Sequence, residues 1–381
     1  MHLGKEQEFS LTVPEPFSFA LTVAKPAGWP WSTPREIFED DTLWTAIRIG
    51  GLPAGLVMDA RRNRVRVRVF TESRLKKGEI RELKEIILAG LGADEDLAGF
   101  YMFAENDPVL KIATEDHRGM RIGLLDDVFG GVVLAILLQM APIERSERMM
   151  DAVLDLAGTP VSFDSREVVL WPLPEEIARL GPDPLRKKAM IGYRADRLVR
   201  AAEYLKKNPI SLRNLAEIPE EEAMKILTAI PGIGRYSAAI IFGQSTPPID
   251  AWSVVIMSEL YDRRTPVHSR KEIEKVQAML VARWGRWSWL AFAYILNDMI
   301  TWQRSTRYHG CGKRNHSSNV SRFSWLRDLK YEPTGNTFNT EFFLPNGEWD
   351  SLRNVWVLSI WAQERENGHL FIKMKRFLLE Q

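Results

Sequence analysis

The first third of the chain alternates apolar and polar positions with the two-residue period that is typical of β-strands. The alternation is clearest at residues 65–69, where valine and arginine take turns, so that one strand face would be buried and the other basic. The polar run 61–64 separates this segment from residues 56–60 and predicts the turn of a hairpin. Strands are also predicted at the apolar runs 9–13, 17–23 and 43–50, and a helix at 78–92.

From about residue 124 the apolar positions recur at helical spacing. Asp126 and Asp127 can start a helix over residues 128–140, whose Leu, Ile and Val content predicts burial and which ends before Pro142. Other helices are predicted at 144–156, 175–180, 182–205, 272–284 and 290–302, with an extended piece within 161–170. We therefore expect an α+β fold.

Three parts are expected along the chain. Residues 1–115 form an N-terminal antiparallel sheet domain with one or two helices, and residues 116–302 form a mainly α-helical domain. Residues 303–381 form a C-terminal extension with a basic loop and a small appended subdomain. A length of 381 residues fits two or three domains.

Composition narrows the possible functions. The net charge of +1, from 51 basic and 50 acidic residues, gives no overall attraction for nucleic acid, so a binding surface must come from local clustering. The single cysteine, Cys311, excludes an internal disulfide, a four-cysteine zinc site and a cysteine-held iron–sulfur cluster. The N-terminus does not resemble a signal peptide, and no apolar run reaches about 18 residues. We expect a soluble, intracellular monomer with no membrane partner.

The stretch from Pro219 to Asp250 has the strongest signals. A helix is predicted to start at Pro219, to carry three glutamates in its first turn, and to end at Pro231. Gly232-Ile233-Gly234 then allows a tight turn that leaves no side chains in the way of a ligand. A second helix starts near Arg235, and its free N–H groups form a seat for an anion such as phosphate. The plainer alternative is a helical hairpin that uses glycine only for close packing.

Asp250 follows a loop that contains Pro247 and Pro248 and precedes an apolar helical run, residues 251–261. It therefore occupies an N-cap position. Most Asp residues at such positions are simply caps, and this interpretation stays open beside a chemical role.

At this point the chain resembles the helix-hairpin-helix DNA glycosylases. Their hairpin has the form Leu/Ile-Pro-Gly-Ile/Val-Gly, here residues 230–234, and an Asp follows at a helix start, here Asp250. The resemblance implies that Gly232, Gly234 and Arg235 bind the backbone of double-stranded DNA, and that Asp250 is the catalytic carboxylate. It also implies a monovalent cation, Na or K, held by main-chain carbonyls, with no cofactor for the chemistry. The carbonyls are those of Thr228, Ile230 and Ile233.

Two further segments extend the resemblance. Residues 135–140 are similar to a segment of the bacterial 3-methyladenine DNA glycosylases, in which the residue after a Gln is inserted into the DNA where the damaged base has left. Met140 would be this wedge, with Gln139 beside it, although a Gln and a Met at a helix end are usually surface and core residues. Residues 192–195, Gly-Tyr-Arg-Ala, are similar to a segment of 8-oxoguanine DNA glycosylases, and we assign them no chemistry.

Tyr236 stands where bifunctional relatives carry the lysine that attacks the sugar, so the resemblance implies an enzyme without a lyase step. Tyr236 and Trp252 would line the base pocket, where a ring can stack on an electron-poor, alkylated base, unless Tyr236 is a core residue. The loop before Asp250 is shorter than in relatives, which leaves Asp262 as a second candidate carboxylate. A second pocket tryptophan of the bacterial enzymes is replaced by Leu296.

The expected function is a monofunctional DNA glycosylase of base excision repair, acting on an alkylated purine. It would be located in the cytoplasm of a prokaryote or in a nucleus. The alternatives are a glycosylase for oxidised or deaminated bases and a non-catalytic DNA-binding module, which would have no need of Asp250.

Two minor features of the sequence stay open. The basic face of residues 65–69 could contact DNA, although water on that side is sufficient, and His309, Cys311 and His316 form only a weak candidate metal site.

Overall fold

The computed structural model describes residues 1–27, 30–243, 246–264, 266, 268–308, 338–341, 359–365 and 369–375. The chain divides into two compact units, Met1–Asp298 and Met299–Gln381. In the second unit β8 (Phe338–Glu341), β9 (Ser359–Arg365) and β10 (His369–Lys375) form an antiparallel sheet in the order β10-β9-β8. The side chains of the predicted basic loop and of the weak metal candidates lie outside the described residues: Arg304, Arg307, His309, Cys311, Lys313, Arg314 and His316.

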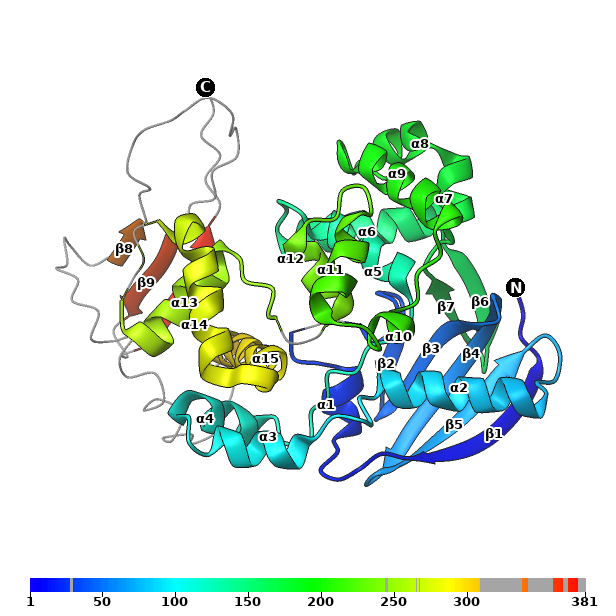
Figure 1. The fold of residues 1–381 in the computed structure, drawn as a ribbon, viewed down its shortest axis with the longest axis horizontal. Helices are drawn as coiled ribbons and strands as arrows, with labels where there is room; N and C mark the ends of the chain where they lie inside the picture. The colour runs from blue at the N-terminus through cyan, green and yellow to red at the C-terminus, as the bar shows by residue number, and fades with distance from the viewer. Residues whose placement is uncertain are drawn as a thin grey trace. The chain divides into compact units, whose positions relative to one another are not determined.

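The first unit begins with a five-stranded antiparallel sheet in the order β1-β5-β4-β3-β2 (Figure 1). Its strands are β1 (Lys5–Thr12), β2 (Ile37–Glu39), β3 (Thr42–Ile49), β4 (Leu52–Arg61) and β5 (Arg64–Thr71). The predicted hairpin is confirmed, since Arg61 pairs with Arg64 at the turn between β4 and β5. The three valines of β5 face a core that also contains Leu83 and Ile87 of α2 (Lys77–Gly90), which lies across this face.

The face of β5 opposite its valines carries its arginines, and two of them, Arg66 and Arg68, are paired with acidic residues. Arg66 donates to Asp59 through Nε at 2.9 Å and through Nη2 at 2.7 Å. Arg68 donates to both carboxylate oxygens of Asp164, at 3.0 and 2.8 Å. The alternation of β5 thus places ion pairs on the face opposite its valines, and arginines that are already paired are less available to DNA phosphates.

The prediction of a strand at residues 17–23 is wrong. This segment contains a short helix, α1 (Phe19–Val23), because Ser18 caps it: the Ser18 hydroxyl accepts from the Leu21 N–H at 3.4 Å. Phe19 and Val23 are four residues apart and both enter the core beneath the sheet. The apolar run is compatible with either period, and the cap decides between them.

A second hairpin, β6 (Thr159–Phe163) and β7 (Arg166–Leu170), confirms the extended piece predicted within 161–170. It packs on the other side of the sheet, where the Phe163 ring lies 5.5 Å from that of Phe70. A Cβ atom on Gly55 would lie 2.4 Å from the Phe163 ring, so glycine is required for this contact. Segments on both sides of the boundary predicted at residue 115 therefore share one core, and the boundary itself stays a prediction.

The predicted α+β fold is confirmed, because the sheet is followed by a long series of helices. One group of these helices encloses a single apolar core, to which α5 contributes along its whole length. Its members are α5 (Val128–Leu138), α6 (Ile143–Ala157), α7 (Pro174–Leu180), α8 (Pro182–Lys187), α9 (Arg194–Lys207), α10 (Leu212–Leu215), α11 (Glu220–Thr228) and α12 (Arg235–Phe242).

A second helical group joins distant parts of the chain. Asp107 accepts from Arg283 Nε at 2.8 Å and from Tyr261 Oη at 3.3 Å, and Tyr101 Oη lies 2.9 Å from Tyr294 Oη. The members of this group are α3 (Leu97–Ala104), α4 (Pro108–Asp116), α13 (Ala251–Asp262), η1 (Ser269–Glu272), α14 (Ile273–Trp284), η2 (Gly285–Trp287) and α15 (Ser288–Tyr308).

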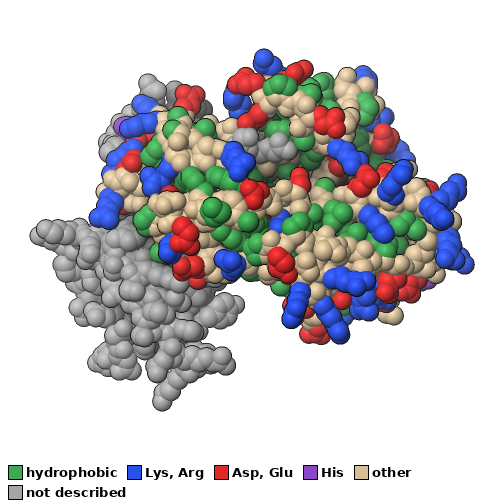
Figure 2. Space-filling view, turned by 60° about the horizontal axis from the view of Figure 1, so that its bottom comes forward, with side chains coloured by type: hydrophobic (Ala, Val, Ile, Leu, Met, Phe, Trp, Pro, Cys, Tyr) green, Lys and Arg blue, Asp and Glu red, His purple; other side chains and the backbone are tan. Residues whose placement is uncertain are grey.

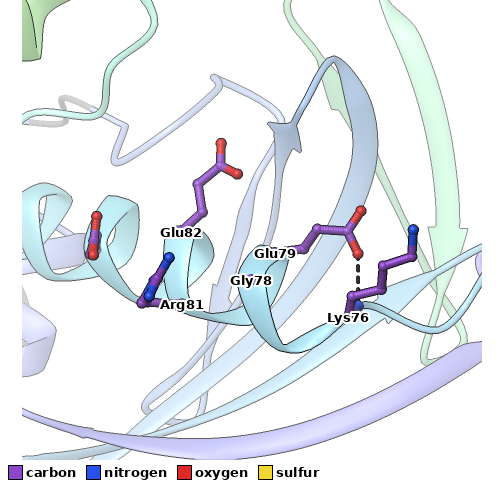
Figure 3. A pocket seen from close by; sticks show the side chains of 6 residues that line it. Lys76, Gly78, Glu79, Arg81 and Glu82 are labelled. Carbon is purple, nitrogen blue, oxygen red and sulfur yellow. Dashed lines mark hydrogen bonds between the residues drawn. The ribbon is translucent and has the colours of Figure 1, made fainter.

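The exposed side of α2 is a mixed-charge surface with a shallow hollow (Figure 3). The N–H of Lys76 donates to the Glu79 carboxylate at 2.7 Å and so caps the helix start. Arg81 and Glu82 add charges of both signs, and we assign this hollow no chemistry. Within the described part of the chain, no helix combines the length and apolarity that crossing a bilayer requires.

Two buried carboxyls make the stability of the protein depend on pH. Burial raises the pKa of Glu36 and of Glu95 from 4.5 to about 7, and burial lowers the pKa of the neighbouring Lys25 from 10.5 to about 8. Between pH 4.5 and 7 the folded protein keeps protons that the unfolded chain has lost. The stability that these carboxyls contribute is therefore present below pH 4.5 and is lost as the pH rises through 7.

We expect the free energy of unfolding to be lower at pH 8 than at pH 5 by on the order of 2 kcal/mol for each carboxyl, since a difference of one pKa unit between the folded and unfolded states corresponds to about 1.4 kcal/mol. Urea titrations at both pH values measure this difference. In Glu36→Gln the difference should shrink, whatever the absolute stability of the variant. An unchanged pH difference in Glu36→Gln would show that this carboxyl does not titrate as described.

Candidate active site

The predicted hairpin connects α11 to α12, and its backbone has the conformation that the two glycines were expected to allow. Gly232 has a φ of +88°, in the region that favours glycine. The Ile233 N–H donates to the Ile230 carbonyl at 3.0 Å and closes the turn. Gly234 is the N-cap residue of α12, with extended φ and ψ of −96° and 178°, and has no side-chain cap. The first N–H groups of α12 are therefore left without a capping side chain.

The surroundings of this helix start suit an anion. The first turn of α12 contains no acidic residue, and the Arg235 side chain is 79% exposed. Glu221 of α11 lies 4.0 Å from the Arg235 guanidinium, so one exposed carboxylate lies near this arginine. A shallow depression runs beside the hairpin and is lined by residues 228–234, Tyr236, Ser237, Gln139, Arg197 and Arg200. Main-chain groups and two arginines of α9 thus face the same surface.

Asp250 is the N-cap residue of α13, as predicted. Its Oδ1 accepts two hydrogen bonds from Ser253, from the N–H at 2.7 Å and from the hydroxyl at 2.8 Å. Both bonds fall on one oxygen, and no group in the described part of the chain donates to Oδ2. The carboxylate is held in place by a cap while one of its oxygens stays available. The capping role and a chemical role are therefore compatible.

Tyr236 lies close enough to Asp250 for the two to interact electrostatically. Burial raises the pKa of Tyr236 above its ordinary value, and the negative charge of Asp250 raises it further, so the phenol is protonated at neutral pH. The residue nevertheless keeps 43% of its surface exposed, and Trp252 keeps 39%. Neither ring contacts another aromatic ring among the described residues. Tyr236 is thus a half-open aromatic surface beside a carboxylate rather than a core residue.

Two further residues from the sequence analysis, the second candidate carboxylate Asp262 and Leu296, lie at the end of α13 and on α15. Asp262 is the last residue of α13, a helix of 12 residues, so it lies about 18 Å along the axis from Asp250. Its carboxylate pairs with Arg264 at 3.4 Å. Leu296 lies on α15 and is half-buried. Geometry separates Asp262 from the hairpin and leaves Asp250 as the carboxylate that interacts with it.

The three carbonyl oxygens predicted to hold a monovalent cation can each still coordinate an ion. The Ile230 carbonyl accepts one hydrogen bond, from Ile233, and an oxygen with two lone pairs can accept more. Among the described residues, no group donates to the carbonyls of Thr228 and Ile233. Neutral carbonyl oxygens are hard ligands of the kind that alkali cations accept. The donor set therefore fits Na or K, and the cation itself stays a prediction.

Gln139 and Met140 end α5 on the same side as the hairpin. The Gln139 side chain donates to the Gly232 carbonyl at 2.8 Å and so contacts the hairpin directly. Met140 is 65% exposed and has a φ of +51°. Met140 thus presents an exposed apolar side chain next to the hairpin, and its role as a wedge stays a prediction. The Gln139 side chain, in contrast, is hydrogen-bonded to protein groups, although it also lines the depression beside the hairpin.

Several residues near this site were not assigned a role from the sequence. Arg194 is buried and donates from Nε to the Gln139 carbonyl at 3.1 Å, and the Tyr193 hydroxyl lies 3.5 Å from the same carbonyl. Met190 is also exposed and has a φ of +54°. In the described part of the chain, all other non-glycine residues with positive φ are Asp, Ser or Arg, so the two methionines stand out. The Gly-Tyr-Arg-Ala segment was the available sequence signal for Arg194, but the partner of Arg194, Gln139 at the end of α5, is 55 residues away.

Charge alone would not have located the site. Figure 2 shows Lys and Arg side chains interspersed with Asp and Glu over one face of the molecule. This agrees with the near-zero net charge of +1. The anion-binding features of the hairpin come from main-chain groups and a few arginines, which a count of charges does not register.

Comparison with known proteins finds relatives for part of the chain. It is 25% identical over 157 residues to a DNA-3-methyladenine glycosylase of Bacillus subtilis, covering 41% of this chain and 52% of that protein. It is also 25% identical over 179 residues to DNA-3-methyladenine glycosylase 2 of Escherichia coli, covering 46% and 60%. The similarity thus spans between about half and three fifths of these relatives. No family model matches the chain.

The fold matches solved structures over a larger share. A 3-methyladenine DNA glycosylase from Archaeoglobus fulgidus superposes with a TM-score of 0.62 at 22% identity, over 76% of this chain and 98% of that one. The 8-oxoguanine glycosylase/lyase of Clostridium acetobutylicum, solved with double-stranded DNA containing cytosine opposite 8-oxoG, gives 0.61 at 16% identity, over 78% and 98%. At these identities the similarity shows a common fold.

Proposed function

Because the chain has the fold of the helix-hairpin-helix DNA glycosylases, as its hairpin motif indicates, we propose that it is a DNA N-glycosylase that uses Asp250. The observation that carries this proposal is the position of the Asp250 carboxylate. It is fixed by Ser253 through one oxygen, keeps the other oxygen available, and interacts with Tyr236 in the first turn of the hairpin's second helix. A module that only binds DNA has no need of a fixed carboxylate next to the hairpin, where it would repel phosphate.

The chemistry follows from the bond that is broken. The bond between the base nitrogen and C1′ of the sugar breaks with its electron pair leaving on the base, so positive charge develops on the sugar. A carboxylate next to C1′ stabilises that charge, as in glycoside hydrolysis. Water then adds its oxygen to C1′ and releases a proton, which Asp250 can accept. The products are the free base and an abasic site.

The hairpin supplies the position of the DNA in this proposal. The uncapped N–H groups at the start of α12, with Arg235 beside them, bind one phosphate. A monovalent cation on the carbonyls of Thr228, Ile230 and Ile233 would contribute a positive charge toward the same backbone. Met140 occupies the space in the stack after the damaged nucleotide has rotated out, which offsets part of the unstacking free energy.

The proposed enzyme is monofunctional. A lyase step requires an amine that attacks C1′ and forms a Schiff base. No lysine occurs in residues 226–270, the stretch that contains the hairpin, Tyr236 and Asp250. Tyr236 occupies the position of the attacking lysine, and its raised pKa keeps the phenol protonated and poorly nucleophilic.

We propose an alkylated purine as the substrate base. An alkylated purine carries positive charge, and half-open aromatic rings such as Tyr236 and Trp252 attract a cation over their faces. The names of the two sequence relatives point in the same direction. An 8-oxoguanine substrate is the second candidate, because the structure of an 8-oxoguanine glycosylase/lyase shares the fold. That base is neutral and would gain less from the rings.

The test is release of the base from duplex oligonucleotides, each with a single alkylated, oxidised or deaminated base. We expect release of an alkylated purine, with strand cleavage only after treatment with alkali, because the enzyme leaves an intact abasic site. Strand cleavage without alkali would contradict the monofunctional mechanism. Tight DNA binding with no release from any of these duplexes would favour the binding module instead.

A further inference from the structure

Gln139 lies at a junction of three elements, and its side chain is hydrogen-bonded to two of them. The Gln139 Nε2 donates to the Gly232 carbonyl of the hairpin at 2.8 Å and lies 3.4 Å from the Ser237 hydroxyl of α12. The Oε1 accepts from Arg197 of α9 at 2.6 Å. Two amide hydrogens and one carbonyl oxygen are thus engaged with protein groups. A hydrogen bond donated by this side chain to DNA would therefore require one of the bonds from Nε2 to break.

The main chain of Gln139 is held just as firmly. Its carbonyl accepts from two nitrogens of the Arg194 guanidinium, one of them Nε at 3.1 Å. Arg194 is only 3% exposed, so this is a buried, charge-assisted interaction with the residue directly before Met140. The guanidinium is therefore committed to the α5 turn.

Met140 needs this support because of its conformation. A side chain other than glycine on left-handed backbone is disfavoured by roughly 1 kcal/mol and persists where neighbouring contacts fix it. The bonds that fix the turn run to α9 through Arg194 and to the hairpin through Gln139. The exposed methionine and the DNA-binding hairpin are therefore parts of one hydrogen-bonded unit.

We propose that Gln139 is a positioning residue that couples insertion of Met140 into DNA to the seating of the hairpin on the backbone. This inference rests on the proposed function, since it assigns a role in opening the DNA duplex. Gln139 acts through two other residues: it holds the Gly232 carbonyl, and it anchors the turn that presents Met140. Direct contact of Gln139 with the DNA is the alternative that the test must separate.

The test uses DNA that requires no chemistry. A duplex with a tetrahydrofuran abasic-site analogue opposite 2-aminopurine offers a ready gap, and the fluorescence of 2-aminopurine reports how this base is stacked. Wild type, Met140→Ala, Gln139→Ala and the double variant are titrated with this duplex. We expect each single variant to lose the fluorescence change and to bind about tenfold more weakly, because the gap is no longer filled.

The decisive comparison is the double variant. If Gln139 serves to couple the wedge to the hairpin, no coupling remains to be lost once Met140 is truncated, so Gln139→Ala adds no more than about twofold to the effect of Met140→Ala. Independent losses that multiply in the double variant would overturn the proposal and indicate that Gln139 touches DNA itself. The assay involves no base release, so its outcome stays readable even if the glycosylase activity is not found.

A second pair of variants covers the case in which Gln139→Ala fails to fold. Arg194→Lys keeps the positive charge but cannot donate from two nitrogens to the Gln139 carbonyl. It should lose the fluorescence change while keeping the affinity for undamaged duplex within about twofold. Met190→Ala is the matched control, an exposed methionine with positive φ that makes no bond to Gln139, and should keep the fluorescence change. Wild-type fluorescence in Arg194→Lys would contradict the coupling.

Discussion

Asp250→Asn should release the substrate base at least about a hundredfold more slowly than the wild type, which is the size of effect seen when one group that stabilises transition-state charge is lost. The variant keeps the shape of the side chain but not its negative charge, so the positive charge that develops on the sugar is no longer stabilised. Single-turnover base release with excess enzyme measures the chemical step directly. DNA affinity should stay equal or rise, because a negative charge near the phosphates is removed.

The choice of asparagine separates chemistry from folding. Asp250 caps α13, and Asn caps a helix start about as well as Asp, so the free energy of unfolding should change by less than about 0.5 kcal/mol. Asp250→Ala would instead lose the cap, and its effect on activity would be mixed with an effect on stability.

Asp262→Asn is the matched control at the other end of the same helix. It removes one carboxylate of the same kind and should retain activity within about twofold, because Asp262 pairs with Arg264 away from the hairpin. Loss of base release in Asp262→Asn with normal release in Asp250→Asn would transfer the catalytic role to Asp262.

Local patterns in the sequence were sufficient to predict the α+β class and many of its helices and strands. The alternation in β5 and the polar turn before it predict a hairpin, because the two-residue period specifies which side chains enter the core. The helix–glycine–helix pattern of residues 219–243 was equally specific, because Pro231 and Gly232 allow few backbone conformations. The segment 17–23 failed because five apolar residues suit either period, and a single Ser18 hydroxyl determines which one forms.

The site was predicted less completely than the fold. Tyr236 could be proposed because it stands at a fixed spacing from the hairpin, and Asp250 because it stands at the next helix start; the charge of Asp250 contributes to the raised pKa of Tyr236. The role of Arg194 could not be inferred, because its partner is a main-chain carbonyl 55 residues away, and any residue type offers such a carbonyl. The resemblance placed Gln139 at the DNA beside Met140; the structure adds that its side chain is bonded to the hairpin and to Arg197, and its contact with DNA stays a prediction. A contact to a main-chain carbonyl does not restrict the residue type at that position, so the sequence contains no signal for it.

Gly232→Ala is expected to weaken DNA binding by about tenfold or more, since it strains the hairpin on which binding depends. At a φ of +88° any side chain is disfavoured, and the new Cβ would lie 3.1 Å from the Cβ of Arg197. Because Arg197 holds Gln139, the shift would spread to the junction with α5. We expect the free energy of unfolding to fall by roughly 1–3 kcal/mol. Urea unfolding and DNA titration at fixed salt measure the two effects.

Gly234→Ala is the matched substitution two residues away. Gly234 has ordinary extended backbone, and a Cβ there meets no heavy atom within 4 Å, so stability should change by less than about 0.5 kcal/mol. Equal destabilisation by both substitutions would contradict the hairpin geometry described above. With stability unchanged, a loss of DNA affinity in Gly234→Ala has one remaining cause, which is that the new methyl group keeps the phosphate away from the first N–H groups of α12. Comparing the two substitutions therefore separates the effect of the positive φ at Gly232 from the effect of a side chain that blocks the approach of DNA at Gly234.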